Sequence, residues 1–134
     1  MKILVTGGAG YVGSILISDL IKKHDVVCLD RFFFGKDYLS QEKFANKVEL
    51  IQDDIRWFNP KILEQIDLVI DLAAMSNDPA GELDPDKTFD INYLGRTRVA
   101  KLSKKFGVKR YILASSASVY GFQENIVNEE SPTN

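Results

Sequence analysis

Three glycines near the amino terminus, Gly7, Gly10 and Gly13, have the spacing of a backbone turn that can bind a phosphate. They follow a short apolar run, Ile3 to Val5, which is typical of a parallel strand buried on both faces. A helix is expected to begin at about Tyr11, with its free N–H groups directed at the glycines. Gly7 would allow the sharp turn, Gly10 a close approach of a pyrophosphate, and Gly13 close packing of the helix. The stretch therefore predicts a dinucleotide-binding loop.

Asp30 is the candidate for binding an adenosine ribose, because it ends a second apolar run, Val26 to Leu29, about twenty residues beyond the glycines. A carboxylate at that place accepts hydrogen bonds from both ribose hydroxyls and repels a 2′-phosphate, which favours NAD over NADP. Arg31 opposes this preference, since a guanidinium can bind a phosphate. We give the acid more weight because it occupies the fingerprint position. The alternative is that Asp30 is only a turn residue at a strand end.

Asp54 and Ile55 follow a third expected strand, Val48 to Ile51. A carboxylate there can accept a hydrogen bond from the adenine amino group, while Ile55 packs on the ring. An aspartate that only caps or turns the chain fits the spacing equally well. The phenylalanines at positions 32–34 suit either the core or one wall of an adenine slot.

Two further strands end in small or hydroxyl-bearing residues. The fourth, Asp67 to Leu72, leads into Ala73 and Ala74, whose small side chains let a ligand pass close. The fifth, Arg110 to Ala114, is followed by serines at positions 115, 116 and 118. Hydroxyls at a strand end can hydrogen-bond a ligand, and they form turns equally well.

The helices after the first are less regular. Met75 to Asp84 contains proline and glycine and is expected to be a loop. A helix should then run from Pro85 to about Phe106. On it, Asn92 is either solvated or reaches the sheet to orient the site, and Gly95 would permit the close packing that this needs. Short helices are expected over Asp37–Asn46 and Pro60–Gln65.

Strands that alternate with helices predict an α/β fold with a doubly wound parallel sheet, of order 3-2-1-4-5 if the crossovers are right-handed. Every candidate residue above lies at or just beyond the carboxyl end of a strand. In such sheets that edge is the ligand crevice. The convergence of several strand ends on one edge is stronger evidence than any single motif.

Composition narrows the function classes. The chain of 134 residues has a net charge of −2 with both signs interspersed, which suits one globular domain and argues against nucleic-acid binding. Its apolar runs are too short for a membrane span, and it begins directly in a strand, so we expect a cytoplasmic protein. Cys28 lies in an apolar strand and should be a buried thiol. His24 has no second ligand nearby, so no metal site is predicted.

The chain resembles the N-terminal, cofactor-binding part of the extended short-chain dehydrogenase/reductase family, specifically the NAD-dependent nucleotide-sugar epimerases and dehydratases. The resemblance covers nearly the whole chain. It departs at Asp71, where many relatives carry histidine, which we interpret as tuning of the strand. It implies a Rossmann-type NAD-binding domain over residues 1–121 and a tail, residues 122–134, leading toward the catalytic and substrate-binding region. The motifs that carry it are TGGAGYVG (Thr6–Gly13), Asp30, Asp54-Ile55, Leu72-Ala73-Ala74, Asn92 with Gly95, and SSASVYG (Ser115–Gly121).

The resemblance also implies a role for each position. The pyrophosphate would be bound by Gly7, Gly10, Tyr11 and Val12, the ribose by Asp30 and Arg31, and the adenine by Asp54 and Ile55. Ala73 and Ala74 would line the nicotinamide half, and Leu72, Asn92 and Ser115 complete the cofactor site. Ser116 would be the catalytic hydroxyl that hydrogen-bonds the reacting oxygen of a nucleotide-sugar substrate.

The family's catalytic base is a tyrosine with a lysine four positions later, and this sequence has no such pair. Tyr120, for example, is followed by Glu124. In the relatives the pair lies beyond the position of Asn134, so we expect this chain alone to be inactive. Three functions remain open: the cofactor-binding part of an epimerase or dehydratase, an NADP-dependent keto-sugar or carbonyl reductase, and a non-catalytic nucleotide-binding or interaction module. An exposed edge at the fifth strand makes a homo-oligomer possible.

Overall fold

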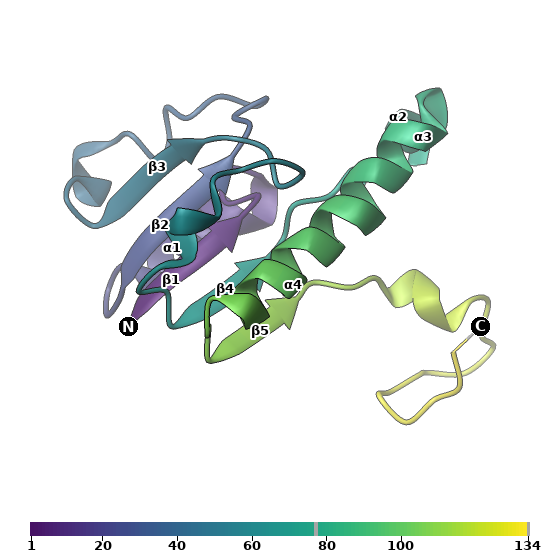
Figure 1. Cartoon of the computed structure of the whole chain (residues 1–134). Helices are drawn as coiled ribbons and strands as arrows, with labels where there is room; N and C mark the ends of the chain where they lie inside the picture. Colours follow the sequence, from purple (N-terminus) through teal and green to yellow (C-terminus); the bar gives the residue numbers. More distant parts are fainter. Residues whose placement is uncertain (77, 134) are drawn as a thin grey trace.

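The computed structural model describes residues 1–76 and 78–133, and its centre is a five-stranded sheet (Figure 1). Neighbouring strands are parallel throughout, and their order is β3-β2-β1-β4-β5. The number, direction and order of the strands confirm the predicted doubly wound sheet. The strands are β1 (Lys2–Thr6), β2 (Asp25–Asp30), β3 (Val48–Gln52), β4 (Leu68–Asp71) and β5 (Arg110–Leu113).

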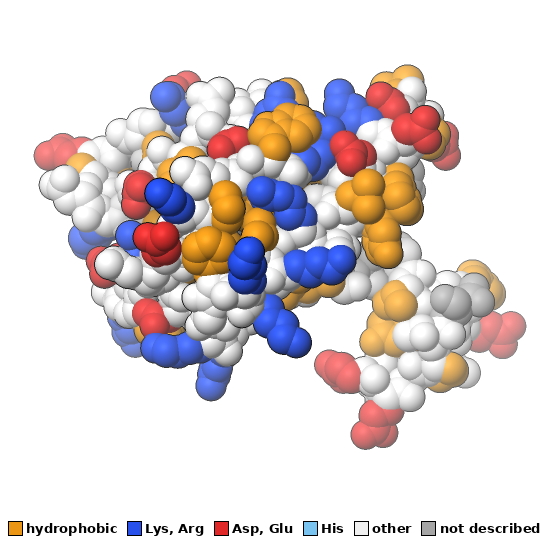
Figure 2. All heavy atoms as spheres, in the orientation of Figure 1, with side chains coloured by type: hydrophobic (Ala, Val, Ile, Leu, Met, Phe, Trp, Pro, Cys, Tyr) orange, Lys and Arg blue, Asp and Glu red, His pale blue; other side chains and the backbone are white. Residues whose placement is uncertain are grey.

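Helices cover both faces of the sheet. In Figure 1, α1 (Tyr11–Leu20) lies behind the strands and α4 (Arg96–Lys105) in front of them. Because successive side chains of a strand point to opposite faces, Leu4 of β1 packs in the cluster that contains Val99 of α4. Its neighbour Val5 packs in the other cluster, with Ile17 of α1. Lysine and arginine side chains cover the outer side of α4 (Figure 2), as expected for an amphipathic helix.

The region after β4 is more helical than predicted. It contains α2 (Asp78–Leu83) and α3 (Pro85–Phe89), followed by a π-helical segment, η3 (Asp90–Gly95), that runs directly into α4. The start at Pro85 is confirmed, with Asp84 as its cap: the Asp84 side chain accepts a hydrogen bond from the Lys87 N–H at 3.0 Å. The loop predicted over Met75–Asp84 is wrong where α2 forms. A proline in the first turn of a helix has no intrahelical N–H to lose, so the proline at position 79 is compatible with this helix.

The two short helices are reduced to single 3-10 turns. Within Asp37–Asn46 only η1 (Glu42–Phe44) forms, and after Asn59 only η2 (Pro60–Leu63). Asn59 caps η2, since its Oδ1 accepts a hydrogen bond from the Lys61 N–H at 3.1 Å. Each turn buries one large side chain, Phe44 and Leu63 respectively, which fixes the segment without a full helical face.

β5 is the edge of the sheet, and the side chains of Ile112 and Leu113 are about half exposed. After Ala114 the chain leaves the sheet, and Figure 1 shows it to one side, where it forms one more short turn, η4 (Ala117–Tyr120). Within the described part of the chain, no helix combines the length and apolar character needed to cross a membrane.

Candidate functional site

The glycine loop has the predicted geometry. Gly7 turns the chain with a φ of +67°, and its N–H donates a hydrogen bond of 2.9 Å to the carbonyl oxygen of Leu29, which ties the loop to the end of β2. A Cβ at Gly13 would lie 2.6 Å from the Gly7 carbonyl oxygen and 2.7 Å from the Gly8 Cα. Helix α1 therefore packs directly on the loop backbone, which confirms the predicted turn at Gly7 and the close packing at Gly13.

The amino end of α1 opens toward the same edge. Gly10 is its N-cap residue, and no side chain in the described residues caps the helix there. The first N–H groups of a helix have no intrahelical acceptor, so those of Tyr11, Val12 and Gly13 can donate to an anion. The side chains of Tyr11 and Val12 are exposed. This end of α1 therefore has the donors and the dipole that a diphosphate requires.

Asp30 lies beside this loop. Its Oδ2 accepts a hydrogen bond from the Ala9 N–H at 2.9 Å, and its Oδ1 accepts one from the Phe32 N–H at 2.7 Å. A carboxylate accepts about four hydrogen bonds in total, so each oxygen retains capacity for one further donor. The glycine loop and the acid of β2 thus share one edge of the sheet, as the dinucleotide interpretation requires.

Asp54 is engaged by two arginines. Its Oδ1 accepts from the N–H and the Nε of Arg56, and its Oδ2 accepts from Nη2 of Arg56 at 2.9 Å and from Nη1 of Arg31 at 2.6 Å. Burial alone would raise the pKa of Asp54, but the hydrogen bonds from Arg56 and Arg31 lower it to about 2. All its acceptor positions are occupied, so an adenine amino group would have to compete for this carboxylate.

Ile55 belongs to the core. Its side chain is buried, and a Cβ at Gly95 would lie only 2.9 Å from its Cδ1. The predicted close packing at Gly95 is therefore confirmed, with Ile55 as the partner. Packing of the Ile55 side chain on an adenine ring remains a prediction, and the structure uses that side chain to join the chain after β3 to η3.

The end of β4 lies against the glycine loop. A Cβ at Gly7 would lie 2.8 Å from the Cα of Ala73 and 2.9 Å from the carbonyl carbon of Leu72. Beyond the exposed Ala74, Asn92 fixes the next residue: its Oδ1 accepts from the Met75 N–H at 2.8 Å, and its Nδ2 donates to the Met75 carbonyl oxygen at 2.9 Å. Asn92 therefore holds the segment that follows β4, so the solvated alternative is wrong, and its role in orienting the site remains a prediction.

The serines after β5 are exposed. Ser116 is the N-cap of η4, and its Oγ accepts a hydrogen bond from the Ser118 N–H at 3.1 Å. Ser115, the residue before it, is also exposed. The turn-forming role that the sequence left open is therefore present at Ser116, and its catalytic role remains a prediction.

The structure also contains a buried polar cluster at the end of β4 that the sequence analysis did not predict. The side chain of Asp71 is fully buried, and its carboxylate accepts hydrogen bonds from Thr6 Oγ1 at 2.5 Å and from the hydroxyl of Tyr111. Arg96 Nε lies 3.6 Å from Asp71 Oδ2, and its Nη2 donates to the Ala114 carbonyl oxygen at 2.6 Å. Burial, together with the hydrogen bond from the Tyr111 hydroxyl to Asp71, raises the pKa of Tyr111. The sequence signal that could have indicated this cluster is an aspartate at the end of an apolar strand.

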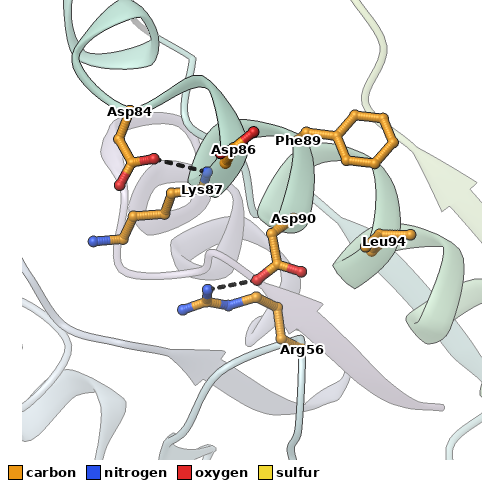
Figure 3. A pocket seen from close by; sticks show the side chains of 7 residues that line it. All are labelled: Arg56, Asp84, Asp86, Lys87, Phe89, Asp90 and Leu94. Atoms are coloured by element: carbon orange, nitrogen blue, oxygen red, sulfur yellow. Dashed lines mark hydrogen bonds and ion pairs between the residues drawn. The ribbon is translucent and has the colours of Figure 1, made fainter.

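Figure 3 shows a separate hollow lined by Arg56, from the segment after β3, and by side chains of α3 and η3. Its volume is about 520 Å³. Arg56 faces it and pairs with Asp90 at 2.8 Å. The hollow contains neither Asp30 nor the glycines, and none of its lining residues was predicted as a site residue. They are Arg56, Asp84, Asp86, Lys87, Phe89, Asp90 and Leu94.

Comparison with known proteins identifies the family. The model of the NAD dependent epimerase/dehydratase family matches residues 3–134. The chain belongs to this family. Its fold matches the N-terminal part of epimerase structures, and the homology to nucleotide-sugar epimerases and decarboxylases covers the cofactor-binding region.

Two curated members of the family are similar in sequence. UDP-glucuronic acid decarboxylase 1 of Arabidopsis thaliana is 37% identical over 123 residues, which are 90% of this chain and 27% of that protein. UDP-glucose 4-epimerase of Lactobacillus helveticus is 34% identical over all of this chain and 41% of its own length. The chain thus spans less than half of these relatives.

Two solved family members have the same fold over the whole of this chain. UDP-glucose-4-epimerase from Stenotrophomonas maltophila, with bound NAD and formylated UDP-arabinopyranose, has a TM-score of 0.91 at 29% identity, and 43% of it is covered. UDP-glucuronic acid 4-epimerase from Bacillus cereus, in complex with UDP-glucuronic acid and NAD, also has a TM-score of 0.91, at 28% identity and 46% coverage. Both structural neighbours carry NAD together with a UDP-sugar.

Proposed function

We propose that this chain binds NAD at the carboxyl edge of its sheet, as the cofactor-binding part of an NAD-dependent nucleotide-sugar epimerase or dehydratase. The observation that supports this most directly is the hydrogen bond of 2.9 Å from the Ala9 N–H to Asp30 Oδ2. It joins the glycine loop, proposed to bind the phosphates, to the acid proposed to bind the ribose. A dinucleotide needs both groups on the same side of the sheet.

The residues present fit NAD. The diphosphate would lie at Gly7, Gly10 and the first N–H groups of α1, where a Cβ at Gly10 would meet only the Gly7 carbonyl oxygen, at 3.3 Å. Asp30 would accept hydrogen bonds from the ribose hydroxyls with its two unused acceptor positions. NAD with a free 2′-hydroxyl suits this carboxylate, and a 2′-phosphate would be repelled by it.

The rest of the cofactor would follow the strand ends. The ribose would lie at the end of β2, beside Asp30 and Arg31, the adenine toward Asp54 and Ile55, and the nicotinamide end toward Ala73 and Ala74. Leu72, Asn92 and Ser115 would support it, Asn92 by holding Met75 through the two hydrogen bonds described above. The NAD-binding domain would comprise residues 1–121, and residues 122–134 would lead toward the region that binds the sugar.

The proposed reaction is a hydride transfer with a nucleotide sugar, for which UDP-sugars are the candidates because the similar enzymes act on them or bind them. When bound, NAD supplies a reversible acceptor for that hydride. Ser116 would hydrogen-bond the reacting sugar oxygen. No tyrosine here has a lysine four positions later, so the chain has no candidate base, and we expect it to bind NAD without turning over a sugar.

Titration calorimetry with NAD tests the proposal. Asp30→Ala removes a charged acceptor, and we expect it to weaken NAD binding by about 1.5–3 kcal/mol, the range for hydrogen bonds to charged groups. Asp25→Ala is the matched control, because Asp25 is an exposed aspartate at the opposite end of the same strand. It should leave the affinity unchanged. Absence of NAD binding by the wild type, or equal effects of the two substitutions, would refute the proposed site.

A further inference from the structure

Arg31 follows Asp30 directly in the chain, and an arginine at this position would favour NADP over NAD. A guanidinium at the end of this strand is well suited to bind the 2′-phosphate of NADP through two parallel hydrogen bonds. Whether it does so depends on where its side chain is held. The contacts of Arg31 therefore bear directly on the choice between NAD and NADP.

The guanidinium of Arg31 is directed away from its own strand end. Its Nη1 donates to Asp54 Oδ2 at 2.6 Å, so the side chain crosses from the end of β2 to the segment after β3. Its Cζ also lies 4.9 Å from the centroid of the Phe33 ring, within reach of a cation–π contact. Two independent contacts thus hold one partly exposed side chain in place.

Asp54 is itself unable to turn away from Arg31. Its carboxylate is 6% exposed, and Arg56 binds both of its oxygens, with Arg56 in turn paired to Asp90 at 2.8 Å. Two guanidinium groups and two carboxylates therefore neutralise each other within one network. The positive charge of Arg31 is compensated, while Asp30, outside the network, keeps its negative charge toward a 2′-phosphate.

We propose that Asp54 is a specificity-determining residue that selects NAD by holding the Arg31 guanidinium and so withholding it from the 2′-phosphate of NADP. This inference rests on the proposed NAD binding and deepens it. Asp54 acts here through Arg31, and its contribution is to the choice of cofactor. Asp54→Asn removes the negative charge and one of the two acceptor oxygens. With the amide oxygen held at the Oδ1 position by the N–H and Nε of Arg56, the NH₂ lies at the Oδ2 position, so Arg31 loses its acceptor and is released.

Four proteins test this: wild type, Asp54→Asn, Arg31→Ala and the double variant, each titrated with NAD and with NADP. The ratio of the two dissociation constants is the readout, because a general loss of adenine binding or of folded protein cancels in it. In Asp54→Asn we expect the preference for NAD to fall about tenfold or more, as a charged hydrogen bond to phosphate becomes available. Arg31→Ala alone should change the ratio by less than about twofold, and in the double variant the fall should disappear.

An unchanged ratio in Asp54→Asn would overturn the inference. So would a roughly tenfold loss of NADP affinity in Arg31→Ala alone, since Arg31 would then already serve the phosphate. This second variant alters a partly exposed side chain, so it decides the matter even if Asp54→Asn does not fold. Failure of the wild type to bind NAD refutes the proposed function and the inference with it. Binding of NAD with no change of ratio refutes the inference alone.

Discussion

Gly13 is the residue on which the geometry of the glycine loop depends most directly. In Gly13→Ala the new methyl group would lie 2.6 Å from the Gly7 carbonyl oxygen, and 2.7 Å from both the Cα and the carbonyl oxygen of Gly8. Ordinary contact begins at 3.4 Å, so α1 and the loop would have to separate by several tenths of an ångström. All three atoms are backbone, so no side-chain rotation can relieve the overlap.

Two opposing effects set the size of the change. Overpacking a closely packed site costs about 1–3 kcal/mol, and backbone partners place Gly13→Ala toward the upper part of that range. Alanine is a better helix former than glycine by at most about 1 kcal/mol. The overlap therefore outweighs the gain, and we expect a net loss of about 1–2 kcal/mol in the free energy of unfolding. Movement of the first turn of α1 should also reduce NAD affinity. We expect about a tenfold increase in the dissociation constant, which corresponds to a loss of about 1.4 kcal/mol in the free energy of binding.

Urea denaturation followed by circular dichroism measures the stability, and calorimetric titration measures the binding. Gly81→Ala is the matched control, because Gly81 also lies in a helix, α2. A Cβ at Gly81 would meet only the Thr88 side chain, at 3.7 Å. That variant should be as stable as the wild type or slightly more stable, with unchanged NAD affinity. The packing argument would be refuted if Gly13→Ala were as stable as Gly81→Ala and bound NAD with wild-type affinity.

Two further predictions concern titratable groups. Burial, with a smaller contribution from the charge of Asp30, raises the pKa of Cys28 to about 12. A disulfide reagent at neutral pH should therefore modify the native thiol far more slowly than the thiol of the urea-unfolded chain. Equal rates would contradict the burial of Cys28. The pKa of Asp54 is depressed from 3.8 to about 2, so its stabilisation is present above pH 4 and is lost as the pH falls through 2. The stability advantage of the wild type over Asp54→Asn should therefore shrink by about 2 kcal/mol between pH 4 and pH 2, and a pH-independent difference would exclude this role.

The sheet could be predicted because each strand is a local apolar run and the crossover rule leaves few possible orders. The short segments could not be predicted in the same way. Phe44 and Leu63 each insert one side chain into the core, and this tertiary contact overrides a weak local preference for a helix. In α2 the proline and glycine suggested a loop, but a proline in the first turn does not prevent a helix.

The candidate site likewise has features that the sequence predicts and features that depend on the folded chain. The glycine turn and the place of Asp30 follow from backbone geometry and strand ends, both of which the sequence encodes locally. The pairing of Asp54 with Arg31 does not follow from the sequence, since Arg31 lies 23 residues away along the chain. Whether a carboxylate faces a ligand or a neighbouring arginine is decided by which side chains the folded chain brings within 3 Å. The aspartate at a strand end was identifiable, and its occupation by two arginines was not.

Asp71, at the carboxyl end of β4, is a second aspartate whose partners come from distant parts of the chain. A buried carboxylate without partners is strongly destabilising, so Thr6, Tyr111 and Arg96 must keep their positions around it. These three residues belong to β1, β5 and α4, and Arg96 also donates to the Ala114 carbonyl oxygen, next to the serine turn. The interpretation that Asp71 adjusts only its own strand is therefore too narrow. The aspartate connects the strand ends that carry the glycine loop, the alanines and the serines, so the edge proposed to bind the cofactor is held from beneath as a single unit.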